Sequence, residues 1–491
     1  MRRHVKLLHF TATFTFSLNG LLALLLMAIS LCTATSTVLP EFYTSDLFLS
    51  AFEHPVRFKL DRNELSSSEL AARSFLQPCG GEEPSAMELV VDMPLTGIPK
   101  DYGYTATFSI GTYDTEGQDR LFHLLIDTGS DLVVLTSEKC PDPECLKVPN
   151  RFNCSASLTC APVINTLTGN DRAVQRYGDG TRAEGRLIQD TVRFVASDPM
   201  NMLNPGSQTD HTPTIPYAAT TTTTGTTLEL IDQPMLLVDQ PGLRLFKSYG
   251  PAVDGIFGLN LGSPVITKTV IQNLRNITTH LLLQNSTAVN IGFMSLWLGH
   301  SYEPGQGGEM LLNAVDVSRF RGPVHWTDRG PHSPYDWTVP LDRGMWLLDP
   351  LSGQEMPLVG SEFTFAVMDS GSDGIYLQRS MYDALFQKVP GARQLAETGY
   401  WRVPCEGTME LVFGIQGEAY KIPYADWVKK PTMTDSAKAM RMETGTEMCQ
   451  SRVYGSSPGP ILLGSTFLRT VYTIFDFSRP GQERVGLARL A

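Results

Sequence analysis

One five-residue pattern occurs twice in this sequence and constrains its fold more than any other feature. An apolar run leads into Asp-Thr-Gly-Ser-Asp at Asp127 and into Asp-Ser-Gly-Ser-Asp at Asp369, 242 positions later. Small and acidic residues in this order make a poor strand and a good tight turn. The odds of one chance copy in a chain of this length are about one in a hundred. Two copies therefore predict a duplicated folding unit, each half of which delivers an aspartate to a turn.

A second short pattern follows each copy of the first. An apolar run leads into glycine in "DGIFGL" (254–259) and again in "PILLGSTFL" (460–468). Glycine has no Cβ, so the backbone of one half can pass close to its twin. Four hydroxyl groups of the two turns can orient the aspartates by hydrogen bonds, and they belong to Thr128, Ser130, Ser370 and Ser372.

Pseudo-two-fold symmetry would bring Asp127 and Asp369 together, and this has a chemical consequence. Two adjacent carboxylates cannot both ionise cheaply, so they share one proton and titrate as a unit. The ionised member can act as general base on a bound water, while the protonated member polarises a carbonyl and then protonates the leaving amine. The pattern predicts peptide hydrolysis that needs no nucleophilic residue, metal or cofactor.

These motifs resemble those of the pepsin-like aspartic proteases, peptidase family A1, from about Asp101 to the C-terminus. "YGYTATFSIGT" is similar to the family's opening strand, and "YGDGTRAEGRLIQDTV" (177–192) is similar to its flap hairpin. "ILLGSTFLRTVYTIFDFSRPGQERVGLA" is similar to its closing strands, and "GGEMLLNAVDVSRFRGPVHW" and "WTVPL" to the join between lobes. The resemblance implies a mostly β, bilobal fold: two pseudo-symmetric β-barrel lobes with the active site in the cleft between them.

The resemblance also assigns roles to residues of this chain. Asp127 and Asp369 would be catalytic, and Tyr177 would be the flap tyrosine that closes over substrate. Substrate-binding positions would be Tyr177, Gly178, Asp179, Gly129, Gly371, Ser130 and Ser372. Asp179 has two interpretations: a common hairpin-tip residue, or a carboxylate that pairs with a substrate lysine or arginine. Val134 departs from the family, which often has a tryptophan there bonded to the flap tyrosine.

The N-terminus predicts processing. A positive start precedes an uncharged apolar segment with small residues near Ala34, which is typical of a signal peptide over 1–34. An uncleaved anchor over about 11–37 is the alternative. The basic residues Arg57, Lys59 and Arg62 resemble part of an inhibitory prosegment, so we expect a propeptide over 35–100. The two lobes would then span 101–315 and 316–491.

Cysteines and sequons fit an oxidising compartment. Removing the signal and the propeptide, which contains Cys79, leaves six cysteines with fifteen possible connectivities. Their spacing favours three disulfides: Cys140–Cys145, Cys154–Cys160 and Cys405–Cys449. A zinc site is the rival, but the usual C-x2-C pairs with histidines are missing. The resemblance supports the first and third disulfides. N-glycosylation sequons occur at Asn153, Asn276 and Asn285.

Composition limits the remaining possibilities. An apolar fraction of 42% with 18% charged residues is typical of a globular protein, and a net charge of −12 disfavours nucleic acid as partner. We expect a monomer that acts on polypeptides and is secreted or held in an acidic vacuole. A catalytically inactive relative that only binds, and a two-carboxylate glycosidase, are the alternatives. Two helices are expected. One spans 265–274, and the other spans 380–389 and begins with Ser380 and Asp383 as a capping box.

Overall fold

The computed structural model describes residues 91–99, 101–114, 120–177, 181–195, 228–240, 253–276, 291–301, 307–330, 333–359, 365–429, 447–456 and 459–491. All of them belong to one of the two units of the chain, Ala86–Ala491. Several predictions concern residues outside these ranges: the signal peptide over 1–34, the basic stretch 57–62, and Cys79, Gly178, Asp179 and Asn285.

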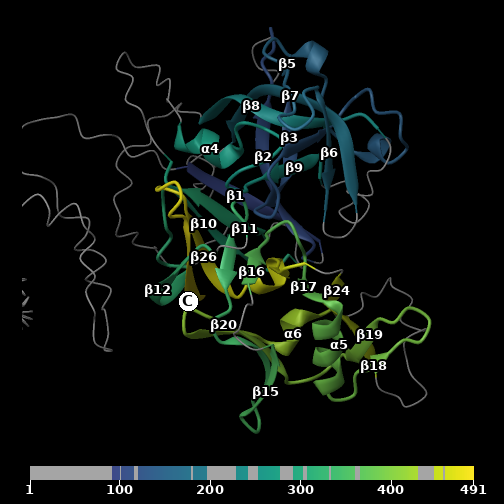
Figure 1. The fold of residues 1–491 in the computed structure, drawn as a ribbon, viewed down its shortest axis with the longest axis vertical. Coiled ribbons are helices and arrows are strands. Elements are labelled where there is room, and N and C mark those ends of the chain that lie inside the picture. The colour runs from purple at the N-terminus through teal and green to yellow at the C-terminus, as the bar shows by residue number, and fades with distance from the viewer. Residues whose placement is uncertain are drawn as a thin grey trace, which may run out of the picture. The chain divides into compact units, whose positions relative to one another are not determined.

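Strands dominate the described chain, as the sequence predicts (Figure 1). A large sheet contains β1 (Val91–Ile98), β2 (Gly103–Ile110), β3 (Leu121–Asp127), β4 (Val133–Thr136), β5 (Ala161–Pro162), β6 (Arg172–Arg176), β7 (Arg182–Phe194), β8 (Glu229–Val238), β9 (Gly255–Gly258), β10 (Phe293–Leu298), β11 (Gly307–Leu312), β12 (Phe320–Asp328), β26 (Val471–Asp476) and β27 (Arg484–Leu490). Its order is β12-β27-β26-β10-β11-β1-β2-β3-β9-β4-β8-β7-β5, with β6 paired to β7.

Three smaller sheets follow in the C-terminal half. The first contains β13 (Thr338–Pro340), β16 (Phe365–Met368), β25 (Ile461–Leu463), β17 (Ile375–Gln378) and β24 (Val453–Ser456), in that order. The second contains β15 (Gln354–Val359), β14 (Gly344–Asp349), β20 (Glu410–Ile415) and β21 (Glu418–Ile422). The third contains β18 (Arg393–Gln394), β19 (Trp401–Pro404), β23 (Met448–Ser451) and β22 (Val428–Lys429).

The strand order confirms the duplication. In the N-terminal half β3 pairs in parallel with β9, β9 in antiparallel with β4, and β4 in parallel with β8. In the C-terminal half β16, β25, β17 and β24 repeat this sequence of pairings. In each half, the repeated Asp motif comes at the end of the first of these four strands. The later glycine pattern forms the second strand.

The halves differ in how their sheets close. A further pairing of β2 with β7 closes β2, β3, β9, β4, β8 and β7 into a ring. Among the described residues of the C-terminal half, β12, β26 and β27 belong to the large sheet, and the other strands form three separate sheets. The large sheet joins the halves, because β10 pairs with β26.

Strand β1 occupies an unexpected position, since it falls in the segment expected to be propeptide. It lies inside the large sheet, between β11 and β2, with Val91 opposite Leu312 and Ile98 opposite Gly103. Its side chains alternate between buried and more exposed positions, and Met93 is fully buried. Removing it would expose two strand edges in the middle of the sheet.

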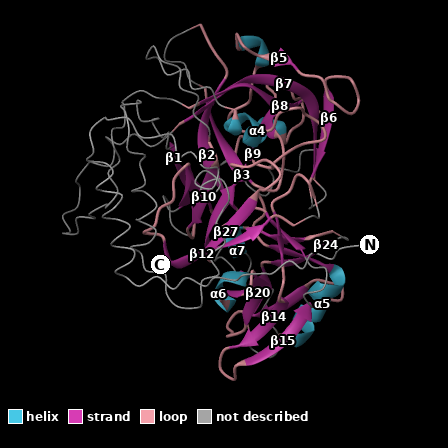
Figure 2. Cartoon of the chain, turned by 60° about the vertical axis from the view of Figure 1, so that its left-hand side comes forward, coloured by secondary structure: helices cyan, strands magenta, loops and turns pink. Residues whose placement is uncertain are grey.

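Helices are few and short, as Figure 2 shows. They are α4 (Val270–Arg275), α5 (Arg379–Lys388), α6 (Tyr424–Trp427) and α7 (Ser465–Leu468), with single 3-10 turns at Cys145–Lys147 and Cys154–Ala156. Helix α4 starts later than expected, at a capping box formed by Thr269 and Gln272. None of the helices in the described ranges is long and apolar enough to cross a membrane.

The capping box expected for the second helix is wrong. Gln378 is the N-cap of α5, without a side-chain cap, and Ser380 lies inside the first turn. The carboxylate of Asp383 has other partners: it accepts hydrogen bonds from Arg379 Nε at 3.0 Å and Trp401 Nε1 at 2.9 Å. One contact within the helix, from Arg379, and one tertiary contact, from Trp401, replace the expected cap.

Apolar side chains from both halves form one core that supports the end of β3. Trp337 is fully buried in it and donates a hydrogen bond from Nε1 to the Leu259 carbonyl at 2.9 Å. The Leu259 amide in turn donates to the carbonyl of Asp127 at 2.8 Å. The backbone that carries Asp127 is therefore held by the centre of the core.

Candidate active site

Asp127 and Asp369 lie at the ends of equivalent strands. Asp127 is the last residue of β3, and Asp369 directly follows β16. The Asp369 amide donates to the carbonyl of Leu463, at the end of β25, at 3.0 Å. Both side chains are buried, with exposed fractions of 5% and 8%. Strands with parallel neighbours tolerate the long apolar runs that precede both residues, since both faces are covered.

The residues after the two aspartates bind each other across the pseudo-symmetry axis. The Thr128 amide donates to Ser370 Oγ at 3.1 Å, and the Ser370 amide donates to Thr128 Oγ1 at 2.9 Å. Each hydroxyl then donates to a carbonyl of the opposite strand, Thr128 to Met368 and Ser370 to Ile126, both at 2.7 Å. Both side chains are almost completely buried. Four hydrogen bonds thus fix the two turns relative to each other.

Each turn also orients its own carboxylate. Asp127 accepts from the Gly129 amide at 2.9 Å through Oδ1 and from the Ser130 hydroxyl at 2.6 Å through Oδ2. The second turn repeats both contacts, from Gly371 at 3.0 Å and from Ser372 at 2.6 Å. The two carboxyl groups are therefore held by the same donors in the same arrangement.

Glycine is required at the third motif position of both turns. A Cβ on Gly129 would lie 2.4 Å from Oδ1 of Asp369, and a Cβ on Gly371 would lie 2.3 Å from Oδ1 of Asp127. Each carboxyl group is therefore packed against the glycine of the other half, which only a residue without a side chain permits. The two carboxyl groups are close enough for each to change the pKa of the other.

Burial and proximity change the acidity of this pair. Burial raises the pKa of Asp127, and the adjacent charge of Asp369 raises it further. Burial also raises the pKa of Asp369, although hydrogen bonds from Ser372 and Asp127 oppose the shift. One proton between two such groups is the stable state over a broad pH range, because a second negative charge would be buried beside the first. The arrangement can both donate and accept a proton.

Strands β6 and β7 form the hairpin expected as a flap. They pair antiparallel from Arg172 with Arg186 to Arg176 with Arg182. The amide of Tyr177 then donates to the Thr181 carbonyl at 3.0 Å. The half-buried ring of Tyr177 packs against an apolar cluster that includes Val134. The adjacent Gly178 and Asp179 lie outside the described residues.

The fifth residue of each motif has contacts that the sequence did not predict. Asp373 accepts hydrogen bonds from the hydroxyls of Tyr376 at 3.2 Å and Tyr454 at 3.0 Å. For Asp131, burial raises the pKa, and the nearby Ser263 lowers it. The sequence signal for these two residues was an aspartate at the fifth position of both motif copies. This pattern does not identify the residues that bind each carboxyl group.

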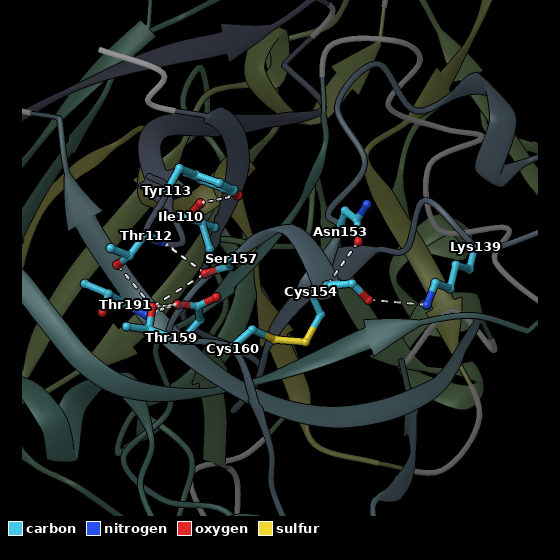
Figure 3. Close-up of a disulfide and its surroundings, with 12 residues drawn as sticks. Ile110, Thr112, Tyr113, Lys139, Asn153, Cys154, Ser157, Thr159, Cys160 and Thr191 are labelled. Atoms are coloured by element: carbon cyan, nitrogen blue, oxygen red, sulfur yellow. Dashed lines mark hydrogen bonds between the residues drawn. A yellow bond between two sulfur atoms is a disulfide. The ribbon is translucent and has the colours of Figure 1, made fainter. Parts of the chain in front are cut away.

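The six cysteines of the described residues form three disulfides: Cys140–Cys145, Cys154–Cys160 and Cys405–Cys449. Figure 3 shows the second, with Asn153 beside it. The Asn153 side chain accepts from the Ser155 amide at 3.0 Å, while Asn276 donates to the Gln272 carbonyl at 2.8 Å. Within the described ranges, no three His, Cys, Asp or Glu residues gather as metal ligands would.

Comparisons with known proteins agree with this geometry. The sequence model of the family described as "Eukaryotic aspartyl protease" matches residues 103–215 and 226–490. The chain is 26% identical over 413 residues to "Pepsin A" of Suncus murinus, covering 83% of this chain and 85% of that protein. It is 26% identical over 400 residues to "Pepsin A-5" of Mus musculus, covering 80% and 82%.

A longer relative is also similar. The chain is 24% identical over 392 residues to "Probable aspartic-type endopeptidase CTSD" of Arthroderma benhamiae. The match covers 79% of this chain but only 61% of that protein, so the chain spans less than two thirds of the relative's length.

Proposed function

Because the chain belongs to the eukaryotic aspartyl protease family, we propose that it is an endopeptidase that uses Asp127 and Asp369 to hydrolyse peptide bonds at acidic pH. One observation carries the proposal: each buried carboxyl group lies against the glycine of the opposite turn, which puts the two carboxyl groups side by side. Two carboxyl groups in this position can hold one water and one proton between them.

The chemistry follows from that shared proton. The ionised carboxylate takes a proton from the water as the water oxygen attacks the peptide carbonyl carbon, while the protonated carboxyl group gives its proton to the carbonyl oxygen. A neutral tetrahedral diol results. The proton taken from water then passes to the amide nitrogen as the C–N bond breaks, and one diol hydroxyl returns its proton to the other carboxylate, which gives a carboxylic acid and an amine and restores the singly protonated pair. Ser130 and Ser372 keep both carboxyl groups in orientation throughout.

The required protonation state explains why we expect an acidic optimum. Activity needs exactly one of the two groups protonated, so it falls when the pair loses its last proton at higher pH. The pKa of each group is raised by burial, which keeps the singly protonated pair populated above the ordinary range of an aspartate.

The test is peptide cleavage at pH 3–7 by the acid-treated chain and by two isosteric variants. Asp127→Asn and Asp369→Asn should each lower kcat by about 10²–10⁴-fold or more, and a statine-type hydroxyl inhibitor should abolish wild-type cleavage. The control is Asp349→Asn, in the β14–β15 hairpin, which should retain activity. Wild-type turnover in either dyad variant would exclude the dyad, and a folded but inactive wild type would favour the binding-protein alternative.

We also propose secretion with removal of the signal peptide over 1–34 and then of a propeptide. The position of β1 supports a processing site before Val91, since cleavage at 100 would take a strand from the large sheet. Arg57, Lys59 and Arg62 could pair with the ionised dyad at neutral pH and dissociate in acid. N-terminal sequencing after acid treatment should find a start upstream of Val91. A start beyond Ile98 would contradict this boundary.

A carboxylate at Asp179 is proposed to bind a substrate lysine or arginine, as the resemblance implies. Cleavage of a peptide library at pH 4–6 by wild type and Asp179→Thr tests it. The variant should lose cleavage after basic residues while it retains cleavage after large apolar ones. Equal profiles at lysine and arginine would leave Asp179 with only its turn role.

A further inference from the structure

Leu259 and Asn260, which directly follow β9, support the turn that carries Asp127. The Leu259 amide donates to the Asp127 carbonyl at 2.8 Å. The Asn260 amide donates to the Ser130 carbonyl at 2.9 Å. A Cβ on Gly258 would lie 2.8 Å from the same Ser130 oxygen, so the two backbone segments are in close contact. The position of this turn therefore depends on where residues 259–260 are held.

Trp337 gives similar support to the turn that carries Asp369. The amide of Met368, the last residue of β16, donates to the Trp337 carbonyl at 2.9 Å. Strand β13 starts at the next residue and pairs antiparallel with β16, with Thr338 opposite Val367. Because Asp369 directly follows Met368, the backbone of Trp337 is bonded immediately before the second turn.

The two supporting segments, 259–261 and 335–337, bind each other. Three hydrogen bonds join them: from the Leu261 amide to the Tyr335 carbonyl at 3.0 Å, from Asn260 Nδ2 to Asp336 Oδ1 at 2.8 Å, and from Trp337 Nε1 to the Leu259 carbonyl at 2.9 Å. Of the three, the bond between Asn260 and Asp336 is the one that joins two side chains. A continuous path of hydrogen bonds thus runs from one catalytic turn to the other through segments outside the repeated motif.

The side chain of Asn260 is held at a cost. It is buried, with an exposed fraction of 4%. Its Oδ1 accepts from no group in the part of the chain that the structure describes. A buried acceptor without a donor is destabilising, and an apolar side chain of similar size would avoid that cost. The bond from Nδ2 to the half-buried Asp336 is the contact that offsets it.

We propose that Asn260 is a positioning residue: through Asp336 it fixes the distance and angle between the two turns that carry the catalytic carboxyl groups. The four hydrogen bonds of Thr128 and Ser370 join these turns at the pseudo-symmetry axis. Contacts at one axis leave a rotation about it, and a second connection through other segments removes that rotation. Proton transfer and attack by water both require a narrow range of distance and angle between the reacting atoms.

The first test does not need activity. Urea unfolding is measured for the full chain with Asn260→Ala, with Asp336→Ala and with both changes. The double variant should unfold less readily than the two single effects predict together, by about fivefold in the unfolding equilibrium constant, because the second change removes a bond that is already broken. Additive effects would overturn the proposal.

The second test is kinetic and rests on the proposed protease function. Asn260→Ala and Asp336→Ala should each lower kcat for a peptide about 10- to 100-fold, with a smaller change in KM, because displaced turns misplace the reacting groups more than the bound peptide. Asp336→Asn should recover most of kcat. Its side-chain oxygen still accepts from Asn260 Nδ2, and its amide offers a donor to Asn260 Oδ1.

Asn273→Ala is the matched control. The Asn273 side chain is also 4% exposed, and its Nδ2 donates to Gln233 Oε1 at 3.1 Å, within the N-terminal half. This variant should lose stability and retain kcat. Equal losses of kcat in Asn260→Ala and Asn273→Ala would overturn the proposal, since lost stability would then explain both. A wild type without activity would refute the protease function, and the urea experiment would still decide whether Asn260 and Asp336 are coupled.

Discussion

Asp131 and Asp373 hold the same place in the two copies of one motif, yet they have different partners. Asp373 accepts from the hydroxyls of Tyr376 and Tyr454, which lie on β17 and β24 of its own sheet. The pKa of Asp131 is instead raised by burial and lowered by the nearby Ser263. The four preceding positions do not differ in this way, because their hydrogen bonds match between halves within about 0.2 Å. Contacts along the pseudo-symmetry axis are thus constrained to be alike, while those directed away from it can diverge.

The β-sheets of the two halves also differ from each other. Six strands of the N-terminal half close into a ring, whereas the described strands of the C-terminal half that lie outside the large sheet form three sheets. A closed ring distributes its hydrogen bonds over all its strands, while separate sheets depend on side-chain packing and covalent links between them. Stability should therefore respond differently to equivalent changes in the two halves.

The disulfides should give the largest contrast. Cys405–Cys449 closes a separation of 44 residues and Cys154–Cys160 one of only 6. In the chain-entropy model, replacing both cysteines by alanine should cost about 4 kcal/mol for the long loop and about 2 kcal/mol for the short one. Urea unfolding of the two double-alanine variants measures this. Equal losses would show that native-state contacts, and not loop length, determine the difference.

The motif glycines should show no contrast. Gly129→Ala and Gly371→Ala each place a methyl group about where a carboxyl oxygen of the other half lies. Each should cost about 1–3 kcal/mol and displace a catalytic carboxyl group, so peptide cleavage should fall in both. Gly417→Ala is a control for positive φ without crowding, since no atom lies within 4 Å of its added Cβ. A tolerated substitution at one motif glycine alone would break the proposed symmetry.

The dyad should make stability depend on pH. Folding raises the pKa of both aspartates above 3.8, so the folded state holds more protons than the unfolded chain above about pH 4. Stability from this pair is complete below that pH and declines as pH rises through the folded-state pKa. Asp127→Asn and Asp369→Asn should each reduce the decline, by about 1 kcal/mol at pH 7. Urea titrations from pH 4 to 7 measure it, and an unchanged decline in both variants would contradict the shared proton.

The smallest effect should come from the partner of Asp373. Tyr454→Phe removes one hydrogen bond within a sheet and should cost about 1 kcal/mol, measured as a lower Tm. An unchanged Tm in Tyr454→Phe would show that the hydrogen bond to Asp373 does not stabilise this sheet.

Local pattern alone was sufficient for several parts of the structure. The repeated motif predicted the duplication, because a strand, a turn and a close-approach glycine are each encoded in a few neighbouring residues. The family resemblance implied the mostly β fold. The motif also singled out Asp127, Asp369 and the four hydroxyl residues that surround them. These residues act on one another through contacts that the symmetry of the motif implies.

Tertiary structure decided what the local pattern could not. The sequence expected Asp383 to cap α5, but Arg379 and Trp401 bind its carboxylate. The propeptide boundary at 100 stays a prediction, but only the structure shows that β1 lies between β2 and β11. The sequence put Asp131 and Asp373 at the same motif position, and only folding brought Tyr454 to Asp373. The physical reason is common to all three: a charged group or strand edge is satisfied by whichever donor the fold brings within reach, and that donor can be any distance away in the chain.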